Sequence, residues 1–324
     1  ALCAFSGVRV VVKGYRLARG WNPEPLFLRY LSGTGFAPRA YATYGDGGSY
    51  LGVVVEFVEG HDPGRNVYAS ALSCARGEDC SVPREVEAVA RALANFHSRM
   101  LACEESWCKP SISGHGDVAR WVKRIETYGS LIEGHGLMTE QLRALVGLSR
   151  SSIERMKGCT ILRTHQDFHF SQTLVTPEGR VLIVDFEGEP ARPEWAARDL
   201  EPAVRDLATL LRALSYISFF SVAEALATDP AGVVSAARRS DPAVERVREW
   251  GLAAAERAAS AYAAGAPRGV LPDKSPGGIL EVAMPWFIER ALYEAVYELE
   301  YRRELAQVAL GTLELGLPPL TSAA

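Results

Sequence analysis

The sequence predicts an α+β fold in two lobes, a small antiparallel-sheet lobe at residues 1–58 and a large, mostly helical lobe at 59–324. Three observations predict it. β-branched apolar runs are concentrated before residue 58, helical periodicity dominates the rest, and one short hairpin at 172–184 interrupts the helices. A length of 324 residues allows one large or two modest domains, and 48% hydrophobic content is ample for a sizeable core.

The charge pattern argues against two classes of partner. The formal net charge is −4, without a basic stripe interleaved with aromatic residues, so we do not expect nucleic acid as a partner. The longest apolar stretch, 210–227, is interrupted by Arg212 and Glu224, and we expect a buried helix there rather than a membrane span. Because no charged-then-apolar leader pattern is visible, we expect a cytoplasmic protein.

The sequence leaves open whether four of the six cysteines are free thiols or form two disulfides. Cys74 and Cys80 are six positions apart and Cys103 and Cys108 are five apart, and neither spacing is that of a zinc site. Free thiols are usual in a cytoplasm, but hyperthermophile cytosols tolerate disulfides, and this chain is rich in Arg, Glu and Ala with 4 Met, as in a thermophile. Both pairs are therefore candidate disulfides, and the remaining two cysteines are expected to be free, Cys3 and Cys159.

The first lobe begins with a strand followed by a capped helix. The β-branched run 8–13 ends on Lys13, the position from which a kinase lysine reaches the α- and β-phosphates of a nucleotide. Asn22 suits the cap of a short helix and Pro23 its first turn. Glu24 lies in that turn, where the helix dipole stabilises a carboxylate. We expect it instead to form an ion pair that orients Lys13.

Two more strands are predicted at 41–44 and 50–58, on either side of a glycine-rich turn. The second leads into a segment in the position of a kinase hinge, where the backbone carbonyl of Glu56 and the amide of Val58 would bind adenine. Twelve residues precede Lys13, too few for the two strands and glycine-rich loop that normally cover the phosphates. We therefore expect either that this lobe is incomplete at its start or that the phosphates are covered in some other way. Gly7 is the sole candidate for that loop.

The predicted hairpin places acidic and amide side chains at one edge of a small sheet. A Pro-Glu-Gly turn separates two short apolar arms, 172–175 and 181–184. Asp167 precedes the first arm, Gln172 begins it, and Asp185 follows the second. Phosphoryl transfer needs such groups, with Asp167 as the base that accepts a hydroxyl proton and with Gln172 and Asp185 as oxygen ligands for Mg²⁺.

The spacing of these residues is that of a kinase catalytic loop. The pattern from His165 through Asp167 to Gln172 has the form His-x-Asp-x-x-x-x-Gln, in which Gln replaces the kinase Asn. Asp185-Phe186-Glu187 stands where kinases carry Asp-Phe-Gly. A surface hairpin with turn aspartates would explain any one of these residues. Three at these spacings, followed by an apolar strand, favour a kinase that uses ATP and Mg²⁺.

The rest of the sequence is predicted to be helical. His97 is interpreted as a packed core or cap residue, and Asp206 either as a helix-start charge or as a hydrogen-bond partner of the catalytic-loop backbone. An irregular loop is expected at 188–199 and a Pro/Gly-rich link at 266–278. The predicted helices are 82–102, 117–133, 139–156, 204–215, 221–228, 243–264 and 279–315.

The last predicted helix carries tyrosines, carboxylates and an arginine at three- and four-residue steps, which places them on neighbouring faces. Aromatic rings beside carboxylates suit a sugar, because its CH faces stack on tyrosine while its hydroxyls bond to glutamate and arginine. A packing helix that merely carries these residues explains the pattern as well. The candidate sugar-binding residues are Tyr293, Glu294, Tyr297, Glu298 and Arg302.

Several stretches resemble the maltokinase (maltose 1-kinase) family, in the aminoglycoside phosphotransferase-like branch of the protein-kinase-like superfamily. The resemblance implies a bilobal protein-kinase-like fold and phosphorylation of maltose at its anomeric hydroxyl, with Asp167 as base and a functional link to trehalose synthase. It also makes His165 and Glu187 candidates for sugar contacts. The stretches are Asn22–Pro25, Glu56–Val58, His165–Gln172, Asp185–Pro190 and Glu289–Glu298.

The departures from this family keep alternatives open. Gln166 and Ser171 replace two family glycines, Arg302 is followed by Arg303 where the family has Pro, and the family's N-terminal cap domain is absent. Glucosamine is the second candidate substrate, because related kinases share the Asp-Phe-Glu-Gly-Glu-Pro element and Glu294 and Glu298 suit an ammonium. An aminoglycoside-type phosphotransferase is a further alternative. A catalytically silent nucleotide- or sugar-binding pseudokinase is the alternative of another class.

Overall fold

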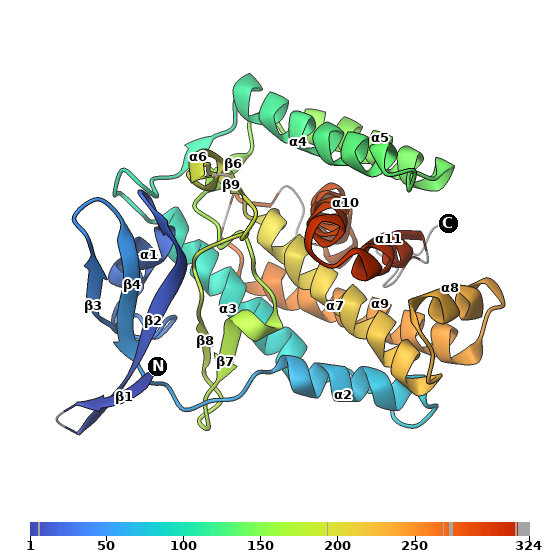
Figure 1. Ribbon diagram of the computed structural model, residues 1–324, viewed down its shortest axis with the longest axis horizontal. Helices are drawn as coiled ribbons and strands as arrows, with labels where there is room; N and C mark the ends of the chain where they lie inside the picture. Colours follow the sequence, from blue (N-terminus) through green and yellow to red (C-terminus); the bar gives the residue numbers. More distant parts are fainter. Residues whose placement is uncertain (6, 193, 268, 272–274, 315, 317–324) are drawn as a thin grey trace. The chain divides into compact units, whose positions relative to one another are not determined.

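In the computed structural model (Figure 1), the chain forms two compact units. Unit 1 comprises residues 1–63 and 165–199, and unit 2 comprises 64–164 and 200–324. The first division falls near the lobe boundary expected at residue 58, whereas the inclusion of 165–199 in unit 1 was not expected. The structure describes the chain except residues 6, 193, 268, 272–274, 315 and 317–324.

Unit 1 contains a four-stranded antiparallel sheet in the order β1-β2-β4-β3. The strands predicted at 41–44 and 50–58 are confirmed, but the strand predicted to end at Lys13 continues to Arg19. It continues because β4 pairs with β2 beyond the lysine, at Gly14. The strands are β1 (Leu2–Phe5), β2 (Val8–Arg19), β3 (Ala40–Gly45) and β4 (Tyr50–Glu56).

The link between β1 and β2 contains the glycine that was the candidate for a phosphate-covering loop. Gly7 has a φ of +81°, a left-handed conformation that suits glycine, and it joins two antiparallel strands that pair from Phe5 and Val8 onward. The preceding residue, Ser6, lies outside the described residues. Gly7 is therefore a hairpin-turn residue, and its role over the phosphates stays a prediction.

Tyr44 covers part of this sheet and leaves no room for a side chain at Gly52. The Tyr44 hydroxyl donates a hydrogen bond to the carbonyl of Lys13 (3.0 Å). A Cβ at Gly52 would collide with that hydroxyl and with the same carbonyl oxygen. Gly52 thus allows β2, β3 and β4 to pair closely under the tyrosine.

Gly52→Ala should lower the free energy of unfolding by about 1–3 kcal/mol, because the collision forces the sheet or the tyrosine to move. The matched control is Gly48→Ala in the β3–β4 turn, where an added Cβ would meet the Asp46 carboxylate at 3.9 Å, an ordinary contact. That control should change stability by less than about 0.5 kcal/mol. Denaturant unfolding of both variants measures the difference, and equal effects would contradict the packing argument.

Helix α1 (Pro23–Leu31) begins as the sequence predicts. The side-chain oxygen of Asn22 accepts a hydrogen bond from the amide of Glu24 (2.9 Å), and Pro23 occupies the first turn. The helix buries its apolar face, including Phe27, whose ring stacks on Phe186 at 4.9 Å between centroids. This stack joins α1 to the segment that follows the hairpin.

The predicted hairpin is confirmed as β7 (Thr173–Val175) and β8 (Val181–Ile183), preceded by the 3₁₀ turn η1 (Phe170–Gln172). Two sets of backbone hydrogen bonds attach it to the rest of unit 1. His61 and Val175 exchange bonds of 3.0 Å, and the amide of Ile183 donates to the carbonyl of Phe36 (2.7 Å). These bonds explain why the segment 165–199 groups with the N-terminal sheet; this segment also includes α6 (Glu194–Ala197).

Unit 2 is mostly helical, as predicted, with two differences in how the helices are divided. The helices predicted at 204–215 and 221–228 are one continuous helix, and the helix predicted at 279–315 breaks at Arg302, where the backbone leaves helical dihedrals (φ −152°, ψ 69°). Helices α2 and α8 were not predicted. The helices are α2 (Gly64–Ala75), α3 (Arg84–Leu101), α4 (His115–Gly134), α5 (Glu140–Glu154), α7 (Val204–Ala225), α8 (Pro230–Arg238), α9 (Pro242–Gly265), α10 (Pro276–Tyr301) and α11 (Ala306–Glu314), with η2 (Arg303–Leu305).

Helix α7 is the central helix of unit 2 and packs against α2, α9 and α10 (Figure 1). It is long and apolar enough to span a membrane by length and composition, but 72% of its most apolar window is buried inside the structure. The expectation of a buried helix here is confirmed. A small sheet in the order β5-β6-β9 completes the unit, formed by Ser111–Ile112, Thr160–Leu162 and Glu201–Pro202.

His97 is a fully buried residue of α3, as predicted. Its ring nitrogens lie 2.8 Å from the hydroxyl of Tyr262 and 3.1 Å from a carboxylate oxygen of Asp206. Buried polar groups need such partners. This chain of contacts therefore stabilises the packing of α3 between α7 and α9, and the expected bond between Asp206 and the catalytic-loop backbone stays a prediction.

The structure contains both candidate disulfides, and both lie in unit 2. Cys74–Cys80 joins the end of α2 to the loop that follows it, and Cys103–Cys108 closes a short loop after α3. The remaining cysteines are free, as expected, with Cys3 exposed and Cys159 half-buried.

Candidate active site

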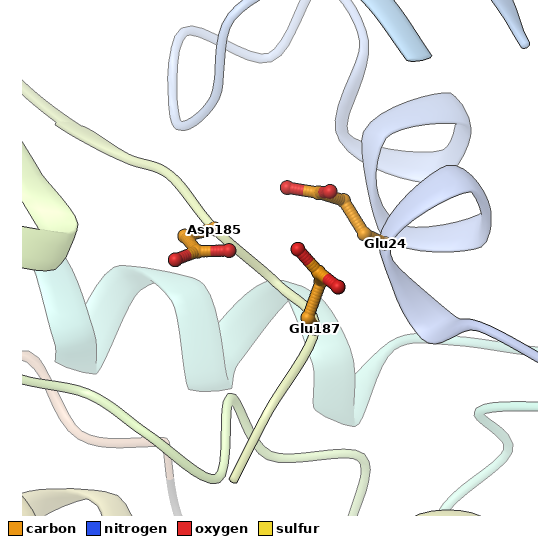
Figure 2. A group of neighbouring side chains, drawn as sticks. All are labelled: Glu24, Asp185 and Glu187. Carbon is orange, nitrogen blue, oxygen red and sulfur yellow. The ribbon is translucent and has the colours of Figure 1, made fainter. Parts of the chain in front are cut away.

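The carboxylates of Glu24, Asp185 and Glu187 lie close together in unit 1 (Figure 2), and Lys13 of β2 forms ion pairs with all three. Its ammonium nitrogen is 2.9 Å from Glu24, 2.5 Å from Asp185 and 2.8 Å from Glu187. The ion pair between Lys13 and Glu24 that the sequence suggested is thus present. Asp185 and Glu187 come from the segment after β8, so one lysine connects the strand, the helix and the hairpin.

The cluster shifts the proton equilibria of its members. Burial alone would lower the pKa of Lys13, but the charges of Glu24 and Asp185 outweigh it and raise that pKa above its usual range. Burial raises the pKa of Glu24, although Lys13 opposes this effect. For Asp185, burial also acts upward, but Lys13 prevails and holds the pKa of that carboxyl below its usual value. With three carboxylates around one ammonium, the site favours cations.

Glu24 links Lys13 to the backbone that carries Asp185. Its side chain is 3% exposed, and besides Lys13 it accepts a hydrogen bond from the amide of Phe186 (3.3 Å). A buried carboxylate is stable only with such partners. The Glu24 side chain therefore links β2 to the segment that carries Asp185. No sequence pattern reveals its contact with the amide of Phe186.

Asp185 is held by the end of the catalytic loop. It adopts a left-handed backbone conformation (φ +61°), uncommon for a residue with a side chain and frequent at functional sites. The amide of Val184 donates to the carbonyl of Gln172 (2.9 Å), and the side chain of Gln172 hydrogen-bonds to Asp185. The two residues assigned to the metal from the sequence are therefore adjacent, and their ligand role stays a prediction.

His165 ties the catalytic loop to the same segment. Its Nε2 lies 3.0 Å from the carbonyl oxygen of Val184, and its ring packs against Phe186 and Phe168 at centroid distances of 5.1 and 5.6 Å. The ring is 1% exposed. These contacts show a structural role that the sequence analysis missed, while the expected sugar contact of His165 stays a prediction.

Alternating burial presents Asp167 at the surface of its loop. Phe168 and Phe170 are buried at 0% and 2% exposure, whereas Asp167 and His169 between and beside them are half-buried. The loop is further tied by a hydrogen bond of 3.0 Å from Ser171 to the carboxylate of Asp62. Two aromatic anchors thus hold the loop, and Asp167 is half-buried beside them.

Gln166, which replaces a family glycine, keeps the backbone conformation that glycine favours. Its φ is +70°, its side chain is 4% exposed, and its amide donates to the carbonyls of Ala197 (3.5 Å) and Asp199 (3.4 Å). These contacts offset the cost of a left-handed residue and attach the catalytic loop to the end of the 188–199 segment.

Gln166→Val should lower the free energy of unfolding by about 1–3 kcal/mol, because a β-branched residue is strained at positive φ. Gln166→Asn is the control, since asparagine tolerates this conformation and retains an amide; it should cost less than half as much. Thermal unfolding of the pair provides the measurement. If valine and asparagine are tolerated equally, the left-handed backbone does not govern this position.

The expected hinge residues lie at the end of β4. Glu56 is the last residue of that strand; its amide donates to the carbonyl of Arg39 (2.8 Å), and its carboxylate accepts from the amide of Arg39 (3.3 Å). Val58 follows two residues later and is half-buried. The structure thus orders this segment, and adenine binding by its backbone stays a prediction.

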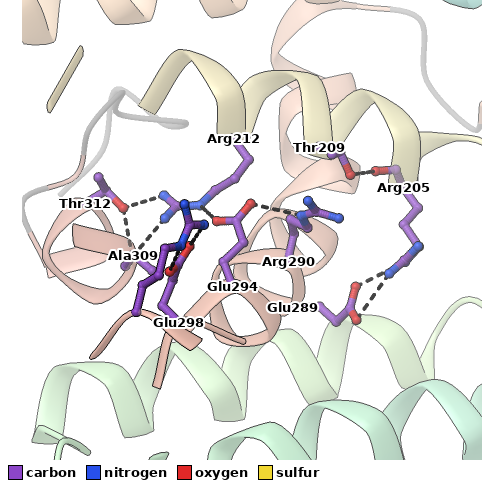
Figure 3. A network of polar contacts seen from close by, with 10 residues as sticks. Arg205, Thr209, Arg212, Glu289, Arg290, Glu294, Glu298, Ala309 and Thr312 are labelled. Atoms are coloured by element: carbon purple, nitrogen blue, oxygen red, sulfur yellow. Dashed lines mark hydrogen bonds and ion pairs between the residues drawn. The ribbon is translucent and has the colours of Figure 1, made fainter. Parts of the chain in front are cut away.

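The candidate sugar-binding tyrosines and glutamates lie on α10 in unit 2, and Arg302 is its C-cap residue. The two glutamates are paired with arginines (Figure 3). Glu294 binds Arg212 (2.6 Å) and Arg290 (2.9 Å), and Glu298 binds Arg302 (2.5 Å). The sequence analysis missed Arg212 and Arg290 as partners, because one is on α7 and the other is a turn away on α10. An ammonium group would have to share these carboxylates with guanidinium groups.

The aromatic part of the same face forms a stacked row. The rings of Tyr293 and Tyr297 stack at 6.3 Å between centroids, and Tyr297 and Tyr301 lie 4.7 Å apart. Tyr293 is 5% exposed and Tyr301 is 59% exposed, so the row runs from the core to the surface. The exposed end could stack against a sugar, whereas the buried end packs in the core. The row is therefore compatible with both interpretations of this helix, a sugar platform and a packing helix.

Deeper in unit 2, ion pairs join four elements without a candidate ligand. Glu289 of α10 binds Arg205 of α7 (3.1 Å) and Arg124 of α4 (2.9 Å), and Arg124 also binds Glu201 of β9 (2.8 Å). The two glutamates are fully buried. We interpret this network as structural, since charges at such depth are stable only when paired.

The chain is similar in sequence to two curated glucosamine kinases. No family model matches the chain. It is 26% identical over 229 residues (65% of this chain) to a glucosamine kinase of Mycolicibacterium smegmatis, and 29% identical over 132 residues (38% of this chain) to one of Streptacidiphilus jiangxiensis. The matches cover 55% and 30% of those proteins, so the chain spans about half the length of these curated relatives or less.

The solved structures show the fold. A glucosamine kinase in complex with glucosamine, ADP and inorganic phosphate superposes with a TM-score of 0.67 at 21% identity, over 97% of this chain and 80% of that one. A second glucosamine kinase structure gives a TM-score of 0.68 at 20% identity, over 97% and 78% of the chains. The chain therefore has the bilobal, protein-kinase-like α+β fold of the solved glucosamine kinases.

Proposed function

We propose that the protein is an ATP- and Mg²⁺-dependent kinase that phosphorylates a hydroxyl group of glucosamine. The observation that carries the proposal is the position of Lys13, paired at once with Glu24 on α1 and with Asp185 after the hairpin. A lysine oriented by a helix glutamate, beside an aspartate that follows a short strand, is the nucleotide-phosphate arrangement of a kinase. The similarity to glucosamine kinases supports the choice of reaction.

Each candidate site residue of unit 1 then has a role in the reaction. Asp167 orients the sugar hydroxyl and accepts its proton, and Lys13, held by Glu24, binds the nucleotide phosphates. Asp185 and Gln172 would hold Mg²⁺. These two side chains are in contact and each has an oxygen that suits this hard cation, and the surrounding carboxylate cluster favours positive charge. When bound, the ion neutralises charge on the transferred phosphoryl group.

Glucosamine takes precedence over maltose, the first substrate inferred from the sequence. The named relatives are glucosamine kinases, and nothing in the comparisons supports maltose or a link to trehalose synthase. The acidic residues of α10 fit an amino sugar better than a neutral disaccharide if the arginines bound to them move aside. Substrate binding by Tyr293, Glu294, Tyr297, Glu298 and Arg302 remains part of this proposal.

A sugar panel tests the proposal. We expect ADP formation from MgATP with glucosamine, and a lower kcat/KM with glucose, which matches glucosamine in all but the ammonium group. Correlated ³¹P and ¹H NMR of the product identifies the phosphorylated hydroxyl. Preference for maltose or kanamycin would overturn the assignment in favour of a maltokinase or an aminoglycoside phosphotransferase. Nucleotide binding without turnover on any sugar would indicate a silent binding module.

A further inference from the structure

A buried arginine lies just before the catalytic loop and donates two hydrogen bonds to one backbone carbonyl. Arg163 follows β6 directly and is 3% exposed. Its Nε and Nη2 both donate to the carbonyl oxygen of Trp107, at 3.2 and 3.0 Å. Arginine keeps its charge at any relevant pH, and burying that charge is costly unless its donors are satisfied. The pair of hydrogen bonds therefore holds the end of β6 at a defined place in unit 2.

The acceptor is itself held by a covalently closed loop. Trp107 lies within the loop that the Cys103–Cys108 disulfide closes, and both cysteines are buried, at 2% and 0% exposure. The indole of Trp107 donates to the carboxylate of Glu105 (2.9 Å), and the amide of Cys108 donates to the carbonyl of Glu105 (3.0 Å). The carbonyl offered to Arg163 thus belongs to a small, internally bonded turn.

The covalent chain connects this anchor to the proposed base. Arg163 precedes His165 by two residues and Asp167 by four. Four residues span at most about 14 Å, so Arg163 and Asp167 are joined by a short stretch of backbone. A displacement of Arg163 should therefore also move the loop that carries Asp167. Misplacement of a reacting group by about 1 Å can reduce a rate about 100-fold. The anchor therefore acts on the part of the chain where position matters most.

We propose that Arg163 is a positioning residue of this enzyme, anchored on the Trp107 carbonyl that the Cys103–Cys108 loop holds in place. The inference rests on the proposed function, because the reaction that Arg163 supports is phosphoryl transfer by Asp167. It goes beyond that function in assigning a positioning role to an arginine and a disulfide of unit 2.

Substitution of the arginine tests the positioning role. Arg163→Met should lower kcat about 10- to 100-fold while the KM for ATP changes less than about threefold, since the nucleotide groups in unit 1 are untouched. Arg163→Lys keeps the charge and one donor, and should recover part of the lost kcat even if the methionine variant folds poorly. An unchanged kcat in both variants would overturn the proposal, as would a loss in KM alone.

The disulfides offer a matched pair of controls for the loop. Cys103→Ser/Cys108→Ser should lower kcat and speed amide hydrogen exchange at residues 160–164, whereas Cys74→Ser/Cys80→Ser, which opens the other disulfide of unit 2, should do neither. Equal effects of the two double variants, or faster exchange at 160–164 without a change in kcat, would overturn the positioning role.

The exchange measurement also separates this inference from the proposed function. If the wild-type protein phosphorylates no sugar, the proposed function fails. Faster exchange at 160–164 in Cys103→Ser/Cys108→Ser alone would still establish the anchor. If the wild-type protein is active and that exchange is unchanged, the anchor fails and the proposed function stands.

Discussion

Asp167→Asn should lower kcat for sugar phosphorylation by about 10²- to 10⁴-fold, the usual contribution of a general base. Asparagine keeps the size of aspartate but cannot accept the hydroxyl proton. Asp167 is half-buried, and the two buried phenylalanines that follow it, Phe168 and Phe170, anchor the loop, so the loop should keep its shape in the variant. Nucleotide affinity, measured by calorimetry, should change little because Lys13 and Asp185 are intact, while steady-state ADP release reports kcat.

A surface aspartate of the same unit provides the control for this substitution. Asp46 lies in the exposed β3–β4 turn, where its carboxylate accepts hydrogen bonds from the amides of Gly48 and Ser49, and an asparagine oxygen can accept the same bonds. Asp46→Asn should leave kcat unchanged. Substantial turnover by Asp167→Asn would show that another group takes the proton, and the assignment of the base would be wrong.

Lys13→Met should raise the KM for ATP about 10- to 100-fold, because a charge-assisted hydrogen bond to phosphate contributes roughly 1.5–3 kcal/mol. The same change should lower the stability of unit 1. Glu24 is 3% exposed and would be left with a buried charge that has lost its cation, a situation that costs several kcal/mol for deeply buried pairs. Calorimetric titration with ATP and denaturant unfolding measure the two effects separately.

The double variant Lys13→Met/Glu24→Gln distinguishes the two effects. Because the buried carboxylate becomes a neutral amide, we expect stability to recover relative to the single variant while ATP affinity stays weak. Lys109→Met, at an exposed lysine of unit 2, should alter neither quantity. Wild-type affinity for ATP in Lys13→Met would refute the phosphate-binding role of this lysine.

Local rules were sufficient for several parts of the candidate site. The Asn22 cap and Pro23 place Glu24 in the first turn of α1, and this is the turn observed. The Pro-Glu-Gly turn predicted the hairpin, and its arms differ from the observed strands by one residue at most. Both features depend on backbone preferences of neighbouring residues, which a sequence displays directly.

Other elements could not be read because distant residues decide them. The pairing of Gly14 with Gly52 carries β2 past Lys13, and the partners of Glu294 come partly from α7. The two helices predicted between 204 and 228 form one helix because its polar residues are buried among neighbouring helices rather than exposed at a break. Periodicity within a segment contains no information about which other segment covers it.

The sequence by itself determined the residue types of the site and the order in which they occur: a strand lysine, a helix glutamate, and a hairpin with an aspartate before and after it. Only the tertiary structure decided that Lys13, Glu24, Asp185 and Glu187 share one point, that Gln166 takes a left-handed conformation, and that Arg163 is anchored on the disulfide loop. The physical reason is the separation along the chain of the residues that interact. Caps and turns are set by neighbours along the chain, whereas most ion pairs and buried hydrogen bonds of the site depend on packing between segments that are distant in the sequence.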